Sequence, residues 1–103
     1  MLWEINPRLV IVHVSGFGQT GEPAMVKRAA YDLTVMAYSG YMSQNGTPEQ
    51  PMNPGPYAGD YINTLMILSS SLAALHKVAR TGVGESIDVA MYETLLKIGR
   101  AHV

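Results

Sequence analysis

A long apolar helix pattern that follows a loop rich in proline and glycine is the feature that most constrains this chain. The loop runs from Gln50 to Asp60 and holds three prolines and two glycines. From there to Arg80, apolar residues recur at helical spacing, which predicts a helix that is buried in something larger. The expected buried face holds Leu65, Leu68, Leu72, Leu75 and Ala79, widened by Met66, Ile67, Ala73, Ala74 and Val78.

Asp60 stands at the expected start of this helix. Aspartate is a favoured N-cap residue, so one interpretation of Asp60 is a helix cap. The other is chemical, because the free N–H groups and the positive end of a helix dipole stabilise a carboxylate. Such a carboxylate can act as a nucleophile. The residues by themselves leave both interpretations open.

The composition indicates that the chain has faces covered by other protein. Its 103 residues allow one small domain or one piece of a larger one. Charged residues make up only 15% of the chain and apolar residues 48%, whereas a typical soluble domain has about 25% charged residues. We therefore expect several faces to pack against protein outside this sequence.

Composition also excludes several classes of function. The chain has no cysteine, which rules out disulfides and thiolate metal sites and fits a cytoplasmic protein. The net charge is −1 with scattered basic residues, so we expect no nucleic-acid partner. The N-terminal residues do not resemble a signal peptide. Ser69, Ser70, Ser71, His76 and Lys77 interrupt the longest apolar run, so we expect no membrane span.

The order of the predicted elements indicates an α/β fold. Leu9 to Val14 is a nearly continuous β-branched run, typical of a parallel strand covered on both faces, in which His13 is either structural or catalytic. Two strands are too few for an independent doubly wound domain, so we expect the incomplete central segment of a Rossmann-like domain. The later elements are a helix over Val26–Met42, a loop to Gly59, the central helix with a stop at Thr81–Gly84, a strand over Ser86–Ala90 and a helix from Met91.

A glycine-rich loop, Ser15 to Pro23, follows the first strand. Ligands of open α/β sheets bind at that edge, and glycine allows a ligand to approach the backbone closely. The spacing of Gly16, Gly18 and Gly21 is not that of a dinucleotide fingerprint. A simple turn is the alternative interpretation.

Five stretches, taken together, resemble the family III CoA-transferases, the CaiB/BaiF group. The resemblance runs from Trp3 to Leu96 and is carried by NPRLVIVHVSGFGQTG, the AYD step at Ala30 to Asp32, SGYMSQNG, PYAGDY and LAALHKVARTGVGESIDVAMYE. It implies that residues 1–96 are part of the large domain of such an enzyme. The groups that hold the CoA nucleotide would then lie outside the chain, and the full-length protein would be an interlocked homodimer.

The resemblance also implies a mechanism and a site. In this family an aspartate, at the position of Asp60, attacks an acyl-CoA thioester and then carries CoA as an aspartyl-CoA thioester. The substrates are acyl-CoA and a small carboxylic acid, with no metal and no permanently bound cofactor. Gly16, Phe17, Gly18 and Gln19 would form part of the wall around the pantetheine or acyl group, or else only pack the strand end. The runs SGY…QNG…QPM and PY..DY are most similar to members that act on L-carnitine and crotonobetainyl-CoA.

Tyr31 separates two activities within the family. The α-methylacyl-CoA racemases resemble this chain at the glycine loop and at Asp60 but carry histidine where Tyr31 stands. A phenol ionises only near about pH 10, which suits proton transfer at neutral pH poorly. Tyrosine at this position resembles the transferases and leaves the racemase as the alternative. The resemblance also implies that Tyr31 is one of the residues that bind the substrate or CoA. A third possibility is an inert fragment, or an interaction module that offers the Leu65–Ala79 face to a partner.

Two further stretches have open interpretations. Lys27 and Arg28 either contact CoA phosphates or form a solvated helix start. After Leu96 the resemblance to the family stops, and one reverse translation of Ile98–Val103 reads as a common sequencing-adapter sequence with an in-frame stop. We therefore expect 97–103 to be a non-native tail.

Overall fold

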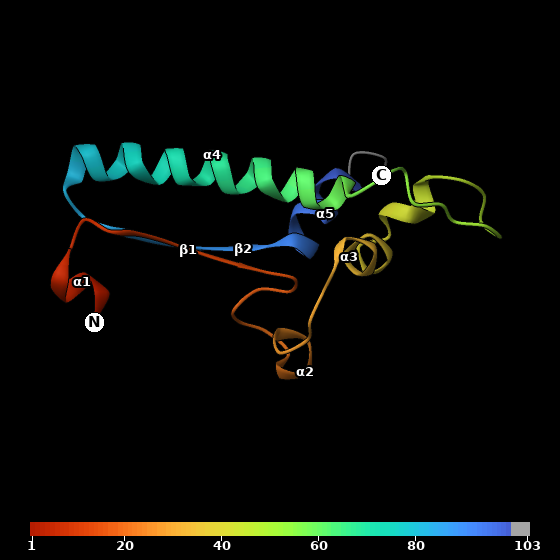
Figure 1. Cartoon of the computed structure of the whole chain (residues 1–103), viewed down its shortest axis with the longest axis horizontal. Helices are drawn as coiled ribbons and strands as arrows, with labels where there is room; N and C mark the ends of the chain where they lie inside the picture. Colours follow the sequence, from red (N-terminus) through yellow and green to blue (C-terminus); the bar gives the residue numbers. More distant parts are fainter. Residues whose placement is uncertain (100–103) are drawn as a thin grey trace.

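The computed structural model describes residues 1–99, with side chains described up to residue 96 (Figure 1). Five α-helices, one 3-10 helix and two strands are present in this part of the chain. In order they are α1 (Leu2–Ile5), β1 (Val10–Ser15), α2 (Pro23–Val26), α3 (Asp32–Tyr38), η1 (Tyr41–Gln44), α4 (Ala58–Thr81), β2 (Glu85–Ala90) and α5 (Met91–Gly99).

The two strands lie side by side in parallel, as predicted. Their register runs from the pair Val10 and Glu85 to the pair Ser15 and Ala90. Both strands lie within one residue of the expected ranges, because a β-branched run defines β1 and an alternation of apolar and polar residues defines β2. The expectation that β1 is covered on both faces is wrong for this chain, since Val14 is 51% exposed and His13 is also exposed. The α/β class is confirmed.

Helix α4 runs back along the strand pair and is the longest element (Figure 1). It ends where predicted, because Gly82 adopts φ 71° and its N–H donates to the carbonyl of Val78 at 2.8 Å. The residues of α4 that are buried are Gly59, Asn63, Ala74 and Val78. Gly59 packs against α3 and α5, since a Cβ at this position would meet Asp32, Leu95 and Met36.

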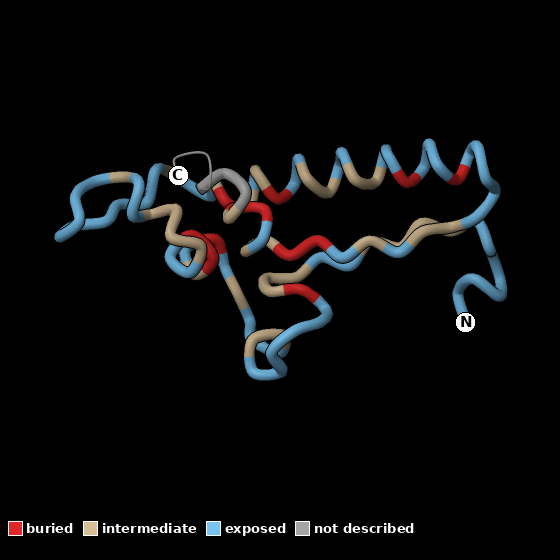
Figure 2. The backbone as a smooth tube through the Cα atoms, turned by 180° about the vertical axis from the view of Figure 1, so that it is seen from behind, coloured by how far each residue is buried: buried red, intermediate tan, exposed pale blue. Residues whose placement is uncertain are grey.

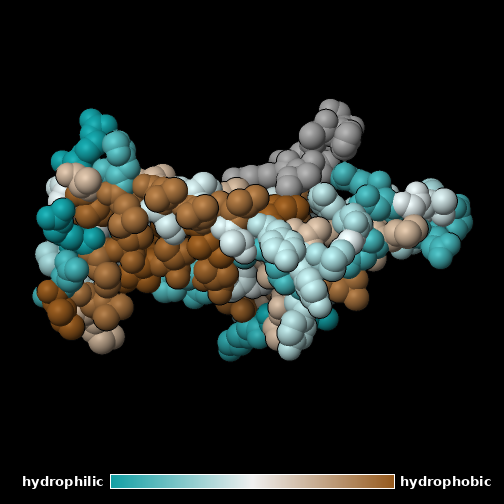
Figure 3. Space-filling view, turned by 45° about the horizontal axis from the view of Figure 1, so that its top comes forward, coloured by the Kyte–Doolittle hydropathy of each residue, from teal (hydrophilic) through white to brown (hydrophobic). Residues whose placement is uncertain are grey.

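The expected buried face of α4 is only partly observed in this chain. Ala74 and Val78 are buried as expected, whereas Ala79 and the four leucines are exposed. Leu65, Leu68, Leu72 and Leu75 are 54–66% exposed. The two-stranded sheet covers only one side of α4, and no other element of the described chain reaches the leucine side. Figure 3 shows apolar side chains gathered in a continuous area over the half of the molecule that contains α4. We call Leu65, Leu68, Leu72 and Leu75 the leucine stripe.

The length and composition of α4 are sufficient for a membrane crossing, contrary to the expectation that no segment qualifies. The core helix of a larger soluble domain meets the same criterion. The absence of a membrane partner therefore stays a prediction.

The single helix predicted over Val26–Met42 is wrong. The chain instead forms α2, an irregular stretch, α3 and η1. Tyr31 is extended, with φ −114° and ψ 169°, and Gly40 at φ 76° separates α3 from η1. The break before Tyr31 coincides with close packing of Ala30 against Gly16, a contact with the end of β1 that leaves no mark in the local pattern.

The core lies at one end of the sheet. Its fully buried residues are Val35 and Met36 of α3 and Leu95 of α5. Figure 2 shows the buried backbone concentrated where α3, the start of α5 and the end of β2 meet. The start of α4 is part of this region, because a Cβ on Gly59 would lie within 3.4 Å of Met36 and Leu95. The best-packed part of the chain therefore surrounds the helix end that carries Asp60.

The predicted tail, 97–103, falls largely outside what the structure describes, since residues 100–103 and the side chains of 97–99 are not described. The non-native origin of this tail stays a prediction.

Candidate active site

The start of α4 has an unusual backbone. Tyr57 precedes the helix in the left-handed conformation, with φ 60° and ψ 30°, and its side chain makes no capping hydrogen bond. It is the single non-glycine residue with positive φ in the described part of the chain. The N–H of Tyr61 donates to the carbonyl of Tyr57 at 3.0 Å and closes the first turn. Left-handed backbone is costly for a residue with a Cβ, so the surrounding structure must hold Tyr57 there.

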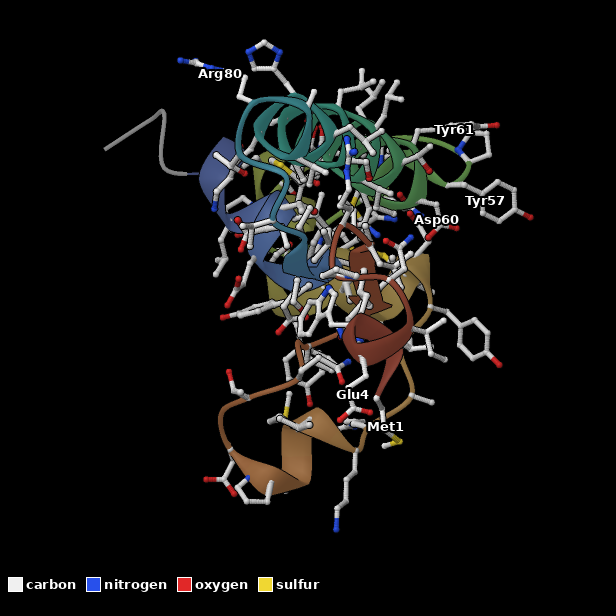
Figure 4. The ribbon with its side chains drawn as sticks, turned by 90° about the vertical axis from the view of Figure 1, so that its left-hand side faces the viewer. Met1, Glu4, Tyr57, Asp60, Tyr61 and Arg80 are labelled. Atoms are coloured by element: carbon white, nitrogen blue, oxygen red, sulfur yellow. The ribbon has the colours of Figure 1, made fainter. Side chains whose placement is uncertain are left out.

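Asp60 is the third residue of α4 and not its cap, because the helix begins at Ala58. Its side chain is half-buried. Among residues 1–96, whose side chains the structure describes, no hydrogen bond or ion pair engages the Asp60 carboxylate. Figure 4 shows Asp60 next to Tyr57 and Tyr61 at this end of the helix. A carboxylate with no protein partner, in the first turn of a long helix, is available to a ligand.

An open depression of about 340 Å³ borders Asp60. Its wall comes from the starts of α3 and α4 and from the loop before α4. It is lined by Tyr31, Asp32, Leu33, Asn53, Pro56, Tyr57 and Asp60. Tyr31 is 80% exposed there. Two residues that sequence reasoning singled out, Tyr31 and Asp60, thus share one depression although Tyr31 precedes α3 and Asp60 lies in α4.

Asp32 is a site residue that sequence reasoning missed. Its Oδ1 accepts a hydrogen bond from the backbone N–H of Asp60 at 3.1 Å, and Asp32 is only 7% exposed. The available signal was an acidic residue directly after Tyr31 in the AYD step. That signal names no partner, because the partner is a backbone group of another helix.

The glycine loop forms a separate region. Gly18 has φ 90° and its N–H donates to Ser15 Oγ at 2.9 Å. The N–H of Gln19 donates to Asp88 Oδ2 at 2.7 Å, which ties the loop to the end of β2. Gly16, Gly18 and Gln19 do not line the depression beside Asp60. Their role as a wall around CoA stays a prediction.

Phe17 points into the core. Its ring packs edge-to-face on Tyr38 with centroids 5.5 Å apart, and lies 5.9 Å from the ring of Tyr92. These contacts favour a packing role for Phe17 in this chain. Its predicted contact with the acyl or pantetheine group is not tested by them.

Arg28 contacts Tyr38. Its guanidinium donates to the hydroxyl of Tyr38 at 2.7 Å and its Cζ lies 5.3 Å from the centre of that ring. Lys27 is exposed. Contact of either residue with CoA phosphates stays a prediction. Over the described residues, no group of three or more His, Cys, Asp or Glu side chains is arranged to hold a metal ion.

The model of CoA-transferase family III matches residues 1–103. The chain belongs to this family. It is 58% identical over 98 residues to a bile acid CoA-transferase, BaiK, of Clostridium scindens, covering 95% of this chain and 22% of that protein. It is 52% identical over 100 residues to an L-carnitine CoA-transferase of Proteus mirabilis, covering 97% and 25%.

Solved structures of the same group have the same fold in this region. A CAIB/BAIF family protein from Brucella suis matches with a TM-score of 0.85 and 34% identity, over 94% of this chain and 25% of that one. A hypothetical protein of Mycobacterium tuberculosis, Rv3272, matches with a TM-score of 0.86 and 28% identity, over 98% and 29%. The chain therefore spans about a quarter of the length of its relatives.

Proposed function

We propose that this chain is a segment of a longer family III CoA-transferase, which moves CoA from an acyl-CoA to a carboxylic acid with Asp60 as the covalent carrier. The observation that carries the proposal is the unpartnered, half-buried carboxylate of Asp60 in the first turn of a 24-residue helix, at the edge of an open depression. Membership of the family supports the same reaction.

The proposed reaction has two exchanges at Asp60. The carboxylate attacks the thioester carbonyl, so that a C–O bond forms, the C–S bond breaks and CoA leaves as a thiolate. The thiolate then attacks the aspartyl carbonyl of the mixed anhydride and releases the donor acid as its carboxylate. The acceptor carboxylate attacks the aspartyl carbonyl of the resulting thioester, so that the C–S bond breaks and a second mixed anhydride forms. The thiolate then attacks the acceptor's acyl carbonyl, which gives the new acyl-CoA and releases Asp60 as its carboxylate. Covalent catalysis of this kind splits one difficult transfer into easier steps.

The start of α4 supports both charges that this chemistry needs. The positive end of the helix dipole favours the ionised Asp60. The N–H groups of the first turn lack acceptors within the helix and can donate to the oxyanion of a tetrahedral intermediate. Because Asp32 occupies the N–H of Asp60, this role falls to Ala58 and Gly59.

For the substrates we propose crotonobetainyl-CoA and L-carnitine. One relative is named for L-carnitine and another for bile acids. Tyr31 and Tyr57, which are 80% and 62% exposed, line the depression with Asp60. The faces of aromatic rings attract quaternary ammonium groups such as that of carnitine. This pairing of exposed rings with a carboxylate favours carnitine over a purely apolar acid.

The remaining expectations belong to the same proposal. CoA acts as a substrate and not as a bound cofactor, and the complete enzyme is a cytoplasmic, interlocked homodimer. The exposed leucine stripe supports further covering by protein outside this chain.

The test uses the complete protein that contains this segment. It is incubated with crotonobetainyl-CoA and L-carnitine, and in parallel with a bile acid CoA ester and a free bile acid, and transfer is followed by chromatography. Mass spectrometry of the digested protein should find a CoA adduct on Asp60. Asp60→Asn should abolish transfer and adduct, while Glu85→Gln, at an exposed ion pair with Lys77, should retain both.

Three results separate the proposals. Transfer by Asp60→Asn would contradict the nucleophile. Transfer only between bile acids would leave the mechanism and overturn the carnitine assignment. Deuterium uptake at the α-carbon in heavy water, with no acyl exchange, would indicate the racemase instead.

A further inference from the structure

We propose that Asp32 is a positioning residue for Asp60. Its carboxylate accepts a hydrogen bond from the backbone N–H of Asp60 and thereby holds the reacting Asp60 carboxylate in place. This inference rests on the proposed function, in which Asp60 is the nucleophile. It adds a role for a residue that does not itself form the covalent adduct.

The contact between Asp32 and Asp60 joins the starts of two helices. The 3.1 Å hydrogen bond runs from the backbone of α4 to a side chain in the first turn of α3. Asp32 is nearly buried and is followed by the fully buried Val35 and Met36 in the same helix. The acceptor is therefore anchored in the best-packed part of the chain, and Asp60 is tied to that anchor by its own peptide group.

Gly59 makes this contact possible. A Cβ on residue 59 would lie 2.8 Å from Asp32 Oδ1, closer than real Cβ atoms approach. It would also lie 3.3 Å from Leu95 Cδ1. The carboxylate of Asp32 thus occupies space that exists only because the residue before Asp60 has no side chain.

Helix α4 has no cap of its own that could do the same. Tyr57, in the N-cap position, makes no side-chain hydrogen bond to the first turn. A carboxylate near a helix start is favoured by the helix dipole and by charge-assisted hydrogen bonds to N–H groups. Asp32 supplies this carboxylate from another helix, which fixes the direction of the Asp60 peptide relative to Tyr31 and the rest of the depression.

A reacting group must be held precisely, since a displacement of about 1 Å can cost about 100-fold in rate. Loss of the Asp32 acceptor should therefore slow the covalent step more than it weakens substrate binding. A residue that only stabilises the fold would lower the melting temperature without this selective effect.

The experiment compares three variants of the complete protein. Asp32→Leu keeps the branched shape but removes the acceptor, and Asp32→Asn keeps an acceptor oxygen. Thr94→Val is the matched control, because Thr94 is also buried, at 5% exposure, and its hydroxyl donates to the carbonyl of Met91 away from Asp60. The measurements are kcat, KM, the rate at which the CoA adduct forms on Asp60, and the melting temperature.

We expect Asp32→Leu to lower kcat and the adduct rate by about 10- to 100-fold with little change in KM. Asp32→Asn should stay within about threefold of the unmodified enzyme, as should Thr94→Val. If Asp32→Leu does not fold, Asp32→Ala takes its place, and the same changes in kcat, adduct rate and KM are expected of it.

Two results would overturn the inference. In the first, Asp32→Leu has the same kcat and the same rate of adduct formation as Thr94→Val. In the second, Asp32→Asn loses as much activity as Asp32→Leu while its melting temperature is unchanged. Failure of the proposed function is seen separately, because it would show as transfer by Asp60→Asn whatever the Asp32 variants do.

Discussion

The backbone of Gly16 lies directly against the methyl group of Ala30. A Cβ on residue 16 would be 2.3 Å from the Cβ of Ala30. This contact joins the loop after β1 to the stretch that leads to Tyr31 and α3. Glycine is required at this position by the closeness of the contact and not by its backbone angles.

Substitution of Gly16 and Ala30, singly and together, should show how much this contact contributes to stability. Gly16→Ala should destabilise the complete protein by about 1–3 kcal/mol, because the added methyl group overpacks a close contact. Adding Ala30→Gly removes the atom that it meets and should restore most of the loss. Thermal or urea unfolding of the two single variants and the double variant gives the coupling energy. Additive losses would show that the contact does not limit stability.

The sequence predicted the strands and the end of α4 because their signals are local. A β-branched run marks β1 and alternating residues mark β2, and Gly82 stops the helix at a left-handed residue. The break between α2 and α3 was missed because it coincides with a contact between Ala30 and Gly16 that is made only in the folded chain. Periodicity continued through it and predicted one helix.

The candidate site was predictable in part. Asp60 and Tyr31 were identified through the family resemblance, and the structure puts them in one depression. Asp32 was not identified, since its hydrogen bond to a backbone N–H of another helix leaves no pattern in the sequence. The leucine stripe was read correctly as one face of a helix, but periodicity cannot tell which covering elements lie within the chain.

Gly59→Ala tests whether packing outweighs helix propensity at the start of α4. Alanine is favoured over glycine in a helix by about 1 kcal/mol. Here, however, the new Cβ would meet Asp32 Oδ1 at 2.8 Å and Met36 Sδ at 3.4 Å. We expect a net destabilisation of about 1–3 kcal/mol, measured by unfolding of the complete protein. Ala73→Gly, on an exposed part of α4, reports the propensity effect alone. A more stable Gly59→Ala variant would mean that the crowding is relieved by small shifts.

Tyr57 should show a conflict between stability and activity. Glycine adopts left-handed backbone without strain, so Tyr57→Gly should change the stability by less than about 1 kcal/mol. The same change removes a ring that lines the depression, and kcat/KM should fall by at least about 10-fold, the discrimination expected from a small number of lost apolar contacts. Tyr57→Phe, which keeps the ring, is the control for the hydroxyl group. Full activity of Tyr57→Gly would show that the ring does not contact substrate.

The leucine stripe should affect the isolated chain and the complete protein in opposite directions. Exposed apolar faces promote association, so Leu68→Gln with Leu72→Gln should reduce self-association of the 103-residue chain. In the complete protein the same pair should lower stability by about 2–5 kcal/mol per leucine, if other elements cover the stripe. Light scattering and thermal unfolding are the measurements. Arg80→Gln, at the exposed end of α4, is the control. If the complete protein with both leucine substitutions were as stable as the one with Arg80→Gln, the leucine stripe would be exposed to solvent in the complete protein.

The parallel register has a consequence for how this region is made. Val10 pairs with Glu85, so β1 leaves the ribosome long before its partner has been synthesised. Until β2 follows, the edge of β1 that β2 will cover has open hydrogen-bonding groups, which other chains can join. Pairings so distant in sequence also form slowly, because the intervening chain must first be ordered. That edge of β1 therefore has no partner from within this segment until β2, which begins at Glu85, has been synthesised.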